Sequence, residues 1–139
     1  MFQLFDYAGD CIVDGVVAQD MKQFEQIWYL REQVAVAGIK HGYCLKYDVS
    51  LKPDDYYKVV EATRDIVRNA TTLSQEEKDQ VSTVGYGHVG DGNLHLNCSI
   101  PGYDNTDFAE RLNDLVDPFV MSFVRDHKGS VSAEHGVGL

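Results

Sequence analysis

The feature that most constrains the fold is a glycine-rich turn between two runs of alternating residues. In YGHVGDGNLHLN, Asp91 and Gly92 form a dipeptide typical of two-residue hairpin turns, in which both residues need positive φ. Strands joined by so short a turn run antiparallel, so the sequence disfavours an all-parallel sheet. The alternation predicts strands over 81–89 and 93–100, whose core-facing residues are Val89, Leu94, Leu96, Cys98 and Ile100.

The segments on either side of this hairpin predict an α+β fold. The expected elements, in chain order, are a helix over 19–36, a strand over 43–49, a helix from Pro53 to Ala70, the two hairpin strands, a helix over 106–128 and a short strand over 130–133. Gly38 should follow the end of the first helix, and Pro118 should kink the last. From residue 43 onward the order is β-α-β-β-α-β, which predicts a ferredoxin-like antiparallel sheet with helices on one face.

Two helices carry apolar stripes suited to cover that face. The stripe of the 53–70 helix consists of Tyr56, Val59, Val60, Thr63, Val67 and Ala70. The stripe of the 106–128 helix consists of Phe108, Leu112, Leu115, Phe119 and Phe123. The second face of the sheet remains available for polar or functional residues.

Composition disfavours several kinds of partner and location. The 139 residues include 22 acidic and 12 basic ones, and a net charge of −10 disfavours nucleic-acid binding, which depends on Lys and Arg. No apolar run approaches the roughly 20 residues of a membrane-spanning helix. The opening MFQLFDYAGD is acidic without a basic flank, so no targeting signal is predicted there. Three widely spaced cysteines are more typical of a reducing compartment than of a disulfide scaffold.

The predicted hairpin places two histidines opposite each other. A two-residue turn pairs His88 with His95 and Tyr86 with Asn97, all on the face away from the apolar residues. Opposed Cβ atoms lie roughly 4.5–5.5 Å apart, which allows two imidazoles to share one metal ion. Solvent-facing polar residues would show the same pattern. The neighbouring glycines and the polar Asn97 favour a site, since glycines allow close backbone approach.

A second polar motif, SAEHGVG, follows the last predicted strand. The Glu134 carboxylate is a candidate third metal ligand, which would give a His₂Glu set with one position open for substrate. His135 would then be available for proton transfer near neutral pH. Arg31 and Lys46 are either anion-binding cations or ordinary surface side chains.

Taken together, GYGHVGDGNLHLN and GSVSAEHGVG resemble the C-terminal domain of FAD-linked 2-hydroxy-acid oxidases and dehydrogenases. This family includes D-2-hydroxyglutarate dehydrogenases, which the chain looks most like, D-lactate dehydrogenases and the flavin subunit of glycolate oxidase. WYLRE and LKYDVSL extend the resemblance over most of the chain from Trp28 onward. The resemblance implies zinc ligands at His88, His95 and Glu134, a catalytic histidine at His135, and substrate contacts at Arg31, Lys46 and Asn97.

The resemblance also implies an activity. We expect an FAD-dependent dehydrogenase that oxidises a D-2-hydroxy acid, first of all D-2-hydroxyglutarate, with D-lactate and glycolate as alternatives. Residues 1–139 are expected to be a partial C-terminal domain, inactive alone, because the family's N-terminal flavin-binding domain is absent from this sequence. The expected cofactors are FAD, bound mainly by that domain, and Zn²⁺. The flavin domain and an electron-acceptor protein are the expected partners, and the mitochondrion is the expected compartment.

Two interpretations from other classes stay open at this point. One is a non-catalytic ferredoxin-like module that binds a metal or an anion. The other is a purely structural α+β interaction domain in which the two histidines have no function.

Overall fold

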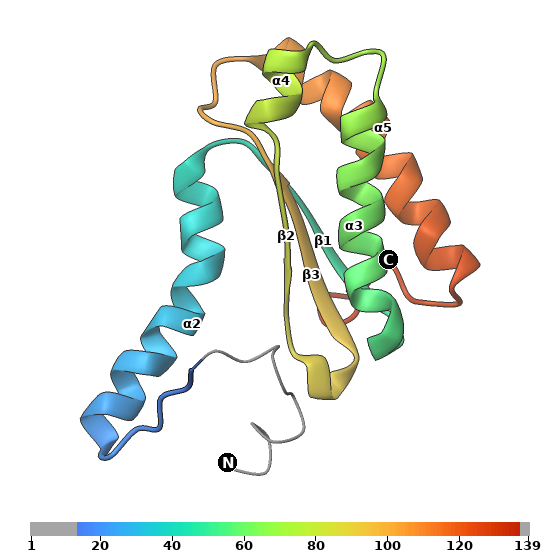
Figure 1. The fold of residues 1–139 in the computed structure, drawn as a ribbon. Helices are drawn as coiled ribbons and strands as arrows, with labels where there is room; N and C mark the ends of the chain where they lie inside the picture. The colour runs from blue at the N-terminus through green and yellow to red at the C-terminus, as the bar shows by residue number, and fades with distance from the viewer. Residues whose placement is uncertain (1–13, 137–139) are drawn as a thin grey trace. The chain divides into compact units, whose positions relative to one another are not determined.

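The computed structural model describes residues 14–136 (Figure 1). In chain order the elements are α2 (Met21–His41), β1 (Cys44–Ser50), α3 (Pro53–Asn69), α4 (Gln75–Gln80), β2 (Ser82–Tyr86), the 3₁₀ helix η2 (Val89–Asp91), β3 (Asn93–Ser99) and α5 (Thr106–Asp126). The chain divides into two units after Ala35, and the second unit contains the whole sheet.

Strand β3 lies at the centre of the sheet, antiparallel to β1 on one side and to β2 on the other. Ser50 and Ser130 form one antiparallel bridge at the other edge of β1, which is where a ferredoxin-like fold places its last strand. The predicted α+β class with an antiparallel sheet is therefore confirmed. The predicted strand over 130–133 is reduced to this bridge, because Ser130 Oγ hydrogen-bonds the backbone of Ser132 and turns the chain away.

Helices α3 and α5 cover the apolar face of the sheet, as Figure 1 shows. All six residues of the predicted α3 stripe are buried. On α5 the buried row agrees with the prediction at Phe108 and Leu112 and then lies one residue further along, because side chains four residues apart form a single ridge along the helix. Its members are Phe108, Leu112, Val116, Val120 and Val124, whereas Leu115, Phe119 and Phe123 are only partly buried beside it.

Helix α2 continues past its predicted end. Gly38 lies inside the helix, and the helix ends at His41. Gly42 follows with a φ of +147°, and a Cβ there would lie 2.3 Å from the backbone nitrogen of Gly102, so this glycine rather than Gly38 marks the turn. None of the side chains of α2 is buried. Among residues 14–136, no helix has both the length and the apolar character required to cross a membrane.

The short helix α4 was not predicted, although the sequence carries its start signal. Ser74 accepts a hydrogen bond from the Glu77 backbone N–H, and the Glu77 carboxylate accepts one from the Ser74 N–H, which is a capping box. Arg111 of α5 donates two hydrogen bonds to the same carboxylate and one to the Thr72 carbonyl. Hydrogen bonds from Arg111, and then from Ser74, lower the pKa of Glu77 from 4.5 to about 2.

Glu77 should therefore contribute stability that depends on pH. Its pKa is depressed on folding, so the contribution is fully present above 4.5 and is lost as the pH falls toward 2. We expect Glu77→Gln to lower the thermal midpoint relative to wild type at neutral pH. The difference between the two midpoints should shrink as the pH falls from 4.5 toward 2. Circular dichroism melts at several pH values measure it. Glu76→Gln, which changes the same charge on the same helix turn, is the control, and an equal, pH-independent effect of both variants would contradict the assignment.

Candidate functional site

The candidate site lies on the face of the sheet opposite α3 and α5. Directly paired residues of an antiparallel sheet share a face. Asp48 of β1 and Tyr86 of β2 both pair with His95 of β3, and Lys46 pairs with Asn97. The structure therefore gathers these five side chains on one face, while their sequence neighbours point into the core.

The turn that carries His88 is longer than predicted. Strand β2 ends at Tyr86, so Tyr86 and not His88 pairs with His95. The His88 carbonyl accepts hydrogen bonds from the backbone N–H groups of Asp91 and Asn93, at 2.8 and 3.3 Å, which closes a 3₁₀ turn in place of a two-residue hairpin turn. Val89, predicted to face the core, is consequently 59% exposed.

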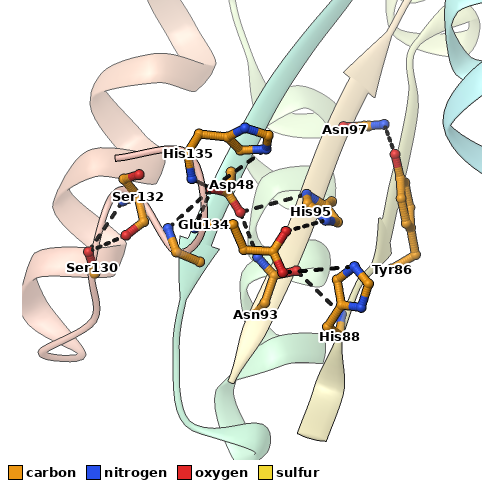
Figure 2. A network of polar contacts seen from close by, with 11 residues as sticks. Asp48, Tyr86, His88, Asn93, His95, Asn97, Ser130, Ser132, Glu134 and His135 are labelled. Carbon is orange, nitrogen blue, oxygen red and sulfur yellow. Dashed lines mark hydrogen bonds and ion pairs between the residues drawn. The ribbon is translucent and has the colours of Figure 1, made fainter. Parts of the chain in front are cut away.

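The two histidines nevertheless meet, and Glu134 joins them (Figure 2). The imidazole centroids of His88 and His95 lie 5.9 Å apart. Nε2 of His88 lies 3.8 Å from Oε1 of Glu134, and Nε2 of His95 lies 3.9 Å from Oε2. One ligand atom from each of the three residues lies within 4.8 Å of the others.

This donor set fits a zinc ion. Ligand atoms around a tetrahedral zinc lie about 3.3 Å apart. The three ligand atoms lie within 4.8 Å of one another, so they must move inward, and the half-exposed His88 and Glu134 side chains have room to do so. Two imidazoles and one carboxylate leave a fourth position for an exogenous oxygen, which is the pattern of catalytic rather than structural zinc sites. The arrangement can therefore bind a divalent cation and present it to a ligand on the sheet face.

Asp48 holds the segment that carries Glu134 and His135. Its Oδ2 accepts hydrogen bonds from three consecutive backbone N–H groups, those of Ala133, Glu134 and His135, at 3.2, 2.9 and 3.2 Å. Its Oδ1 accepts one from Asn93 Nδ2. Burial alone would raise the pKa of Asp48, but these hydrogen bonds outweigh it and the pKa lies below its usual value.

Asn93 connects the histidine loop to the same carboxylate. While its Nδ2 donates to Asp48, its Oδ1 accepts a hydrogen bond from the His88 backbone N–H at 3.3 Å. A Cβ on Gly87 would lie 2.5 Å from the Asn93 carbonyl oxygen, so only glycine permits this close approach. Neither Asp48 nor Asn93 was predicted from the sequence as part of the site. For Asp48 a signal existed, since alternation places it on the same face as Lys46.

The remaining predicted residues lie in different surroundings. His135 Nε2 lies 3.9 Å from Asp48 Oδ2, and the His135 ring centroid lies 6.5 Å from that of His95. Asn97 is buried and donates a hydrogen bond from Nδ2 to the Tyr86 hydroxyl at 3.0 Å. Arg31 belongs to the first unit, where its guanidinium lies 5.4 Å from the centroid of Trp28. Its assignment to the substrate therefore rests on the resemblance alone.

Comparison with known proteins identifies the family. Residues 5–139 match the family model described as FAD linked oxidases, C-terminal domain. The chain belongs to this family. D-2-hydroxyglutarate–pyruvate transhydrogenase of Saccharomyces cerevisiae is 39% identical over 128 residues, which are 92% of this chain and 25% of that protein.

Two further relatives of this FAD linked oxidase domain agree. Mitochondrial D-2-hydroxyglutarate dehydrogenase of Arabidopsis thaliana is 38% identical over 92% of this chain and 20% of its own length. A mitochondrial protein of Schizosaccharomyces pombe, named as a D-lactate dehydrogenase, is 39% identical over 94% of this chain and 24% of its own length. The family resemblance is thereby confirmed, and the chain spans a quarter or less of the length of these relatives.

The geometry predicts that zinc binding requires all three candidate ligands. Removal of one imidazole leaves two protein ligands, too few for a tight site, so His88→Ala and His95→Ala should each abolish stoichiometric zinc. Metal content after dialysis against a weak chelator measures this. His127→Ala is the matched control, since His127 stacks on Phe123 at the end of α5. Equal zinc in wild type and His95→Ala would refute the ligand assignment.

Proposed function

We propose that this chain is the substrate- and metal-binding part of an FAD-dependent dehydrogenase that oxidises D-2-hydroxyglutarate to 2-oxoglutarate. One observation carries the proposal: His88, His95 and Glu134 converge beside His135 on one face of the sheet. Family membership and 38% identity to a D-2-hydroxyglutarate dehydrogenase support the substrate class.

The proposed reaction breaks the O–H and C–H bonds at the hydroxyl carbon and forms a carbonyl. Zinc, held by His88, His95 and Glu134, would supply positive charge that favours ionisation of the hydroxyl, and FAD would supply the hydride acceptor. His135 takes the hydroxyl proton on a ring nitrogen. Its imidazole suits this role, because it is 73% exposed in its side chain and lies at the edge of the ligand cluster.

The carboxylates of the substrate need cationic partners. Lys46 supplies one on the site face, in register with Asn97 and two residues from Asp48. Arg31 is proposed for the second carboxylate by resemblance. Asn97 is proposed by resemblance as a neutral polar contact; its side chain is buried, and its Oδ1 and remaining amide hydrogen are not used in the bond to Tyr86. Charge-assisted contacts of this kind fix both the position and the orientation of a dicarboxylate.

FAD would be held mainly outside the described residues. The sheet of residues 14–136 is antiparallel, and this part of the chain has no parallel strand followed by a glycine-rich loop and a helix, the dinucleotide-binding unit. We therefore propose a flavin-binding domain as the partner of this segment, with a further protein as the electron acceptor.

The mitochondrial names of the relatives support a mitochondrial location.

Removal of the proposed base should slow turnover without removing the metal. We expect His135→Asn to reduce kcat by about 10²–10⁴-fold while zinc content stays at wild-type level. The assay grafts residues 1–139 in place of the matching segment of the Arabidopsis relative and follows dye reduction. The 139-residue chain alone is the blank and should show no turnover. Near-normal turnover by His135→Asn would disprove the assignment of His135 as the base. Turnover by the 139-residue chain alone would disprove the proposal that the flavin is bound mainly by another domain.

Substrate preference distinguishes a D-2-hydroxyglutarate dehydrogenase from a D-lactate dehydrogenase, the two dehydrogenase activities named among the relatives. The cation at Lys46 should matter more for a dicarboxylate, so Lys46→Gln should raise KM for D-2-hydroxyglutarate more than for D-lactate. Steady-state kinetics of the grafted enzyme with both acids measure this, and Lys52→Gln is a control for the lost charge. D-lactate as the better substrate, with no selective effect of Lys46→Gln, would favour a D-lactate dehydrogenase, for which the Schizosaccharomyces pombe relative is the support.

A further inference from the structure

Asp48 contacts Asn93, His95 and segment 133–135, and it lies outside the set of His88, His95 and Glu134. Figure 2 shows it next to Glu134, between His95 and His135. Its Oδ1 lies 3.7 Å from His95 Nδ1, and its Oδ2 lies 3.9 Å from His135 Nε2. Its side chain is 15% exposed, whereas those of Glu134 and His135 are 40% and 73% exposed.

The exposed segment 133–135 depends on Asp48 for its position. Beyond the Ser50–Ser130 bridge, the Ala133 N–H donates a hydrogen bond to the Asp48 carbonyl, and the N–H groups of residues 133, 134 and 135 all donate to Asp48 Oδ2. Three convergent N–H donors form a concave anion-binding arrangement, which a carboxylate fills from β1. The carboxylate thereby substitutes for the ladder that a full fourth strand would have provided.

His95 faces two carboxylates with its two ring nitrogens. Nδ1 faces Asp48, and Nε2 faces Glu134 and the ligand cluster. A proton on Nδ1 is attracted to Asp48 and leaves the lone pair of Nε2 directed at the cluster, which is the arrangement that metal-ligating histidines need. The opposite tautomer would direct a hydrogen into the cluster and a lone pair at Asp48.

From these contacts we propose that Asp48 is a positioning residue that fixes segment 133–135 and the Nδ1–H tautomer of His95. The inference rests on the proposed function for its purpose, but both effects are properties of the metal-free chain. Only a carboxylate can do this, because Oδ1 accepts from Asn93 while Oδ2 accepts from the backbone. An amide at position 48 would turn a donor toward one of these donor groups.

The test compares the 139-residue chain with Asp48→Asn, and with Asp104→Asn as the control. Asp104 is an exposed residue in the loop before α5, so its substitution changes the same charge away from the site. The measurements are amide hydrogen exchange at residues 133–135, the His95 tautomer by long-range ¹H–¹⁵N correlation at mildly alkaline pH, and Zn²⁺ affinity. The tautomer is a readout that a merely structural role would not move.

We expect wild type and Asp104→Asn to carry the His95 proton on Nδ1. Asp48→Asn should show mixed tautomers, exchange at 133–135 that is roughly ten-fold or more faster, and Zn²⁺ affinity about 10- to 100-fold weaker. Wild-type exchange and tautomer in Asp48→Asn would overturn the proposal. If Asp48→Asn does not fold, the wild-type tautomer decides alone, and a proton on Nε2 overturns it. If wild type does not bind zinc, the proposed function is refuted. The exchange and tautomer measurements, which need no metal, would still test the role of Asp48.

Discussion

The register of β3 between β1 and β2 is the constraint on which the site depends. One face of this strand, with Leu94, Leu96 and Cys98, is buried under α3 and α5. The other face presents Asn93, His95 and Asn97. A slip of one residue would expose the core set and bury the histidine, so burial of the apolar face selects the residues that face a ligand. Core packing and site geometry are thus two consequences of one alternation.

The site combines fixed and adjustable parts. His95 and Asp48 come from paired strands, and their side chains are largely buried. His88 and Glu134 come from loops and are about twice as exposed. Asn93 Oδ1 accepts a hydrogen bond from the His88 N–H and Asp48 Oδ2 accepts one from the Glu134 N–H, and these bonds join the two loops to the strands. A metal and its ligand can therefore approach from the loop side, while the strand side keeps the geometry.

Period-two and helical patterns predicted the parts of the fold that are decided by burial. The α3 stripe and the two faces of β3 follow from which residues avoid water. His88 and Glu134 reach His95 through loops held by hydrogen bonds, which burial does not predict. The details decided by local hydrogen bonds did not follow. The His88 carbonyl closes a 3₁₀ turn, so Asp91 and Gly92 do not form the two-residue turn that they predict. Likewise, Gly38 is tolerated within a helix whose end is set by the positive φ of Gly42.

The importance of Asp48 was beyond sequence reasoning for a physical reason. Alternation can place a carboxylate on the polar face, but its function depends on a segment some 85 residues away that returns to the edge of β1. That return is fixed by the Ser50–Ser130 bridge, and pairing with β1 does not continue because the Ser130 hydroxyl bonds the backbone of Ser132 instead. A side chain then takes over what backbone pairing would otherwise do. Because the same carboxylate also faces His95, the position of the Glu134 loop and the orientation of a candidate ligand are determined by one group. Through Asp48, Glu134 of segment 133–135 is held beside His95 of β3, and His88 of the loop after β2 lies next to both. None of these three candidate ligands is completely buried.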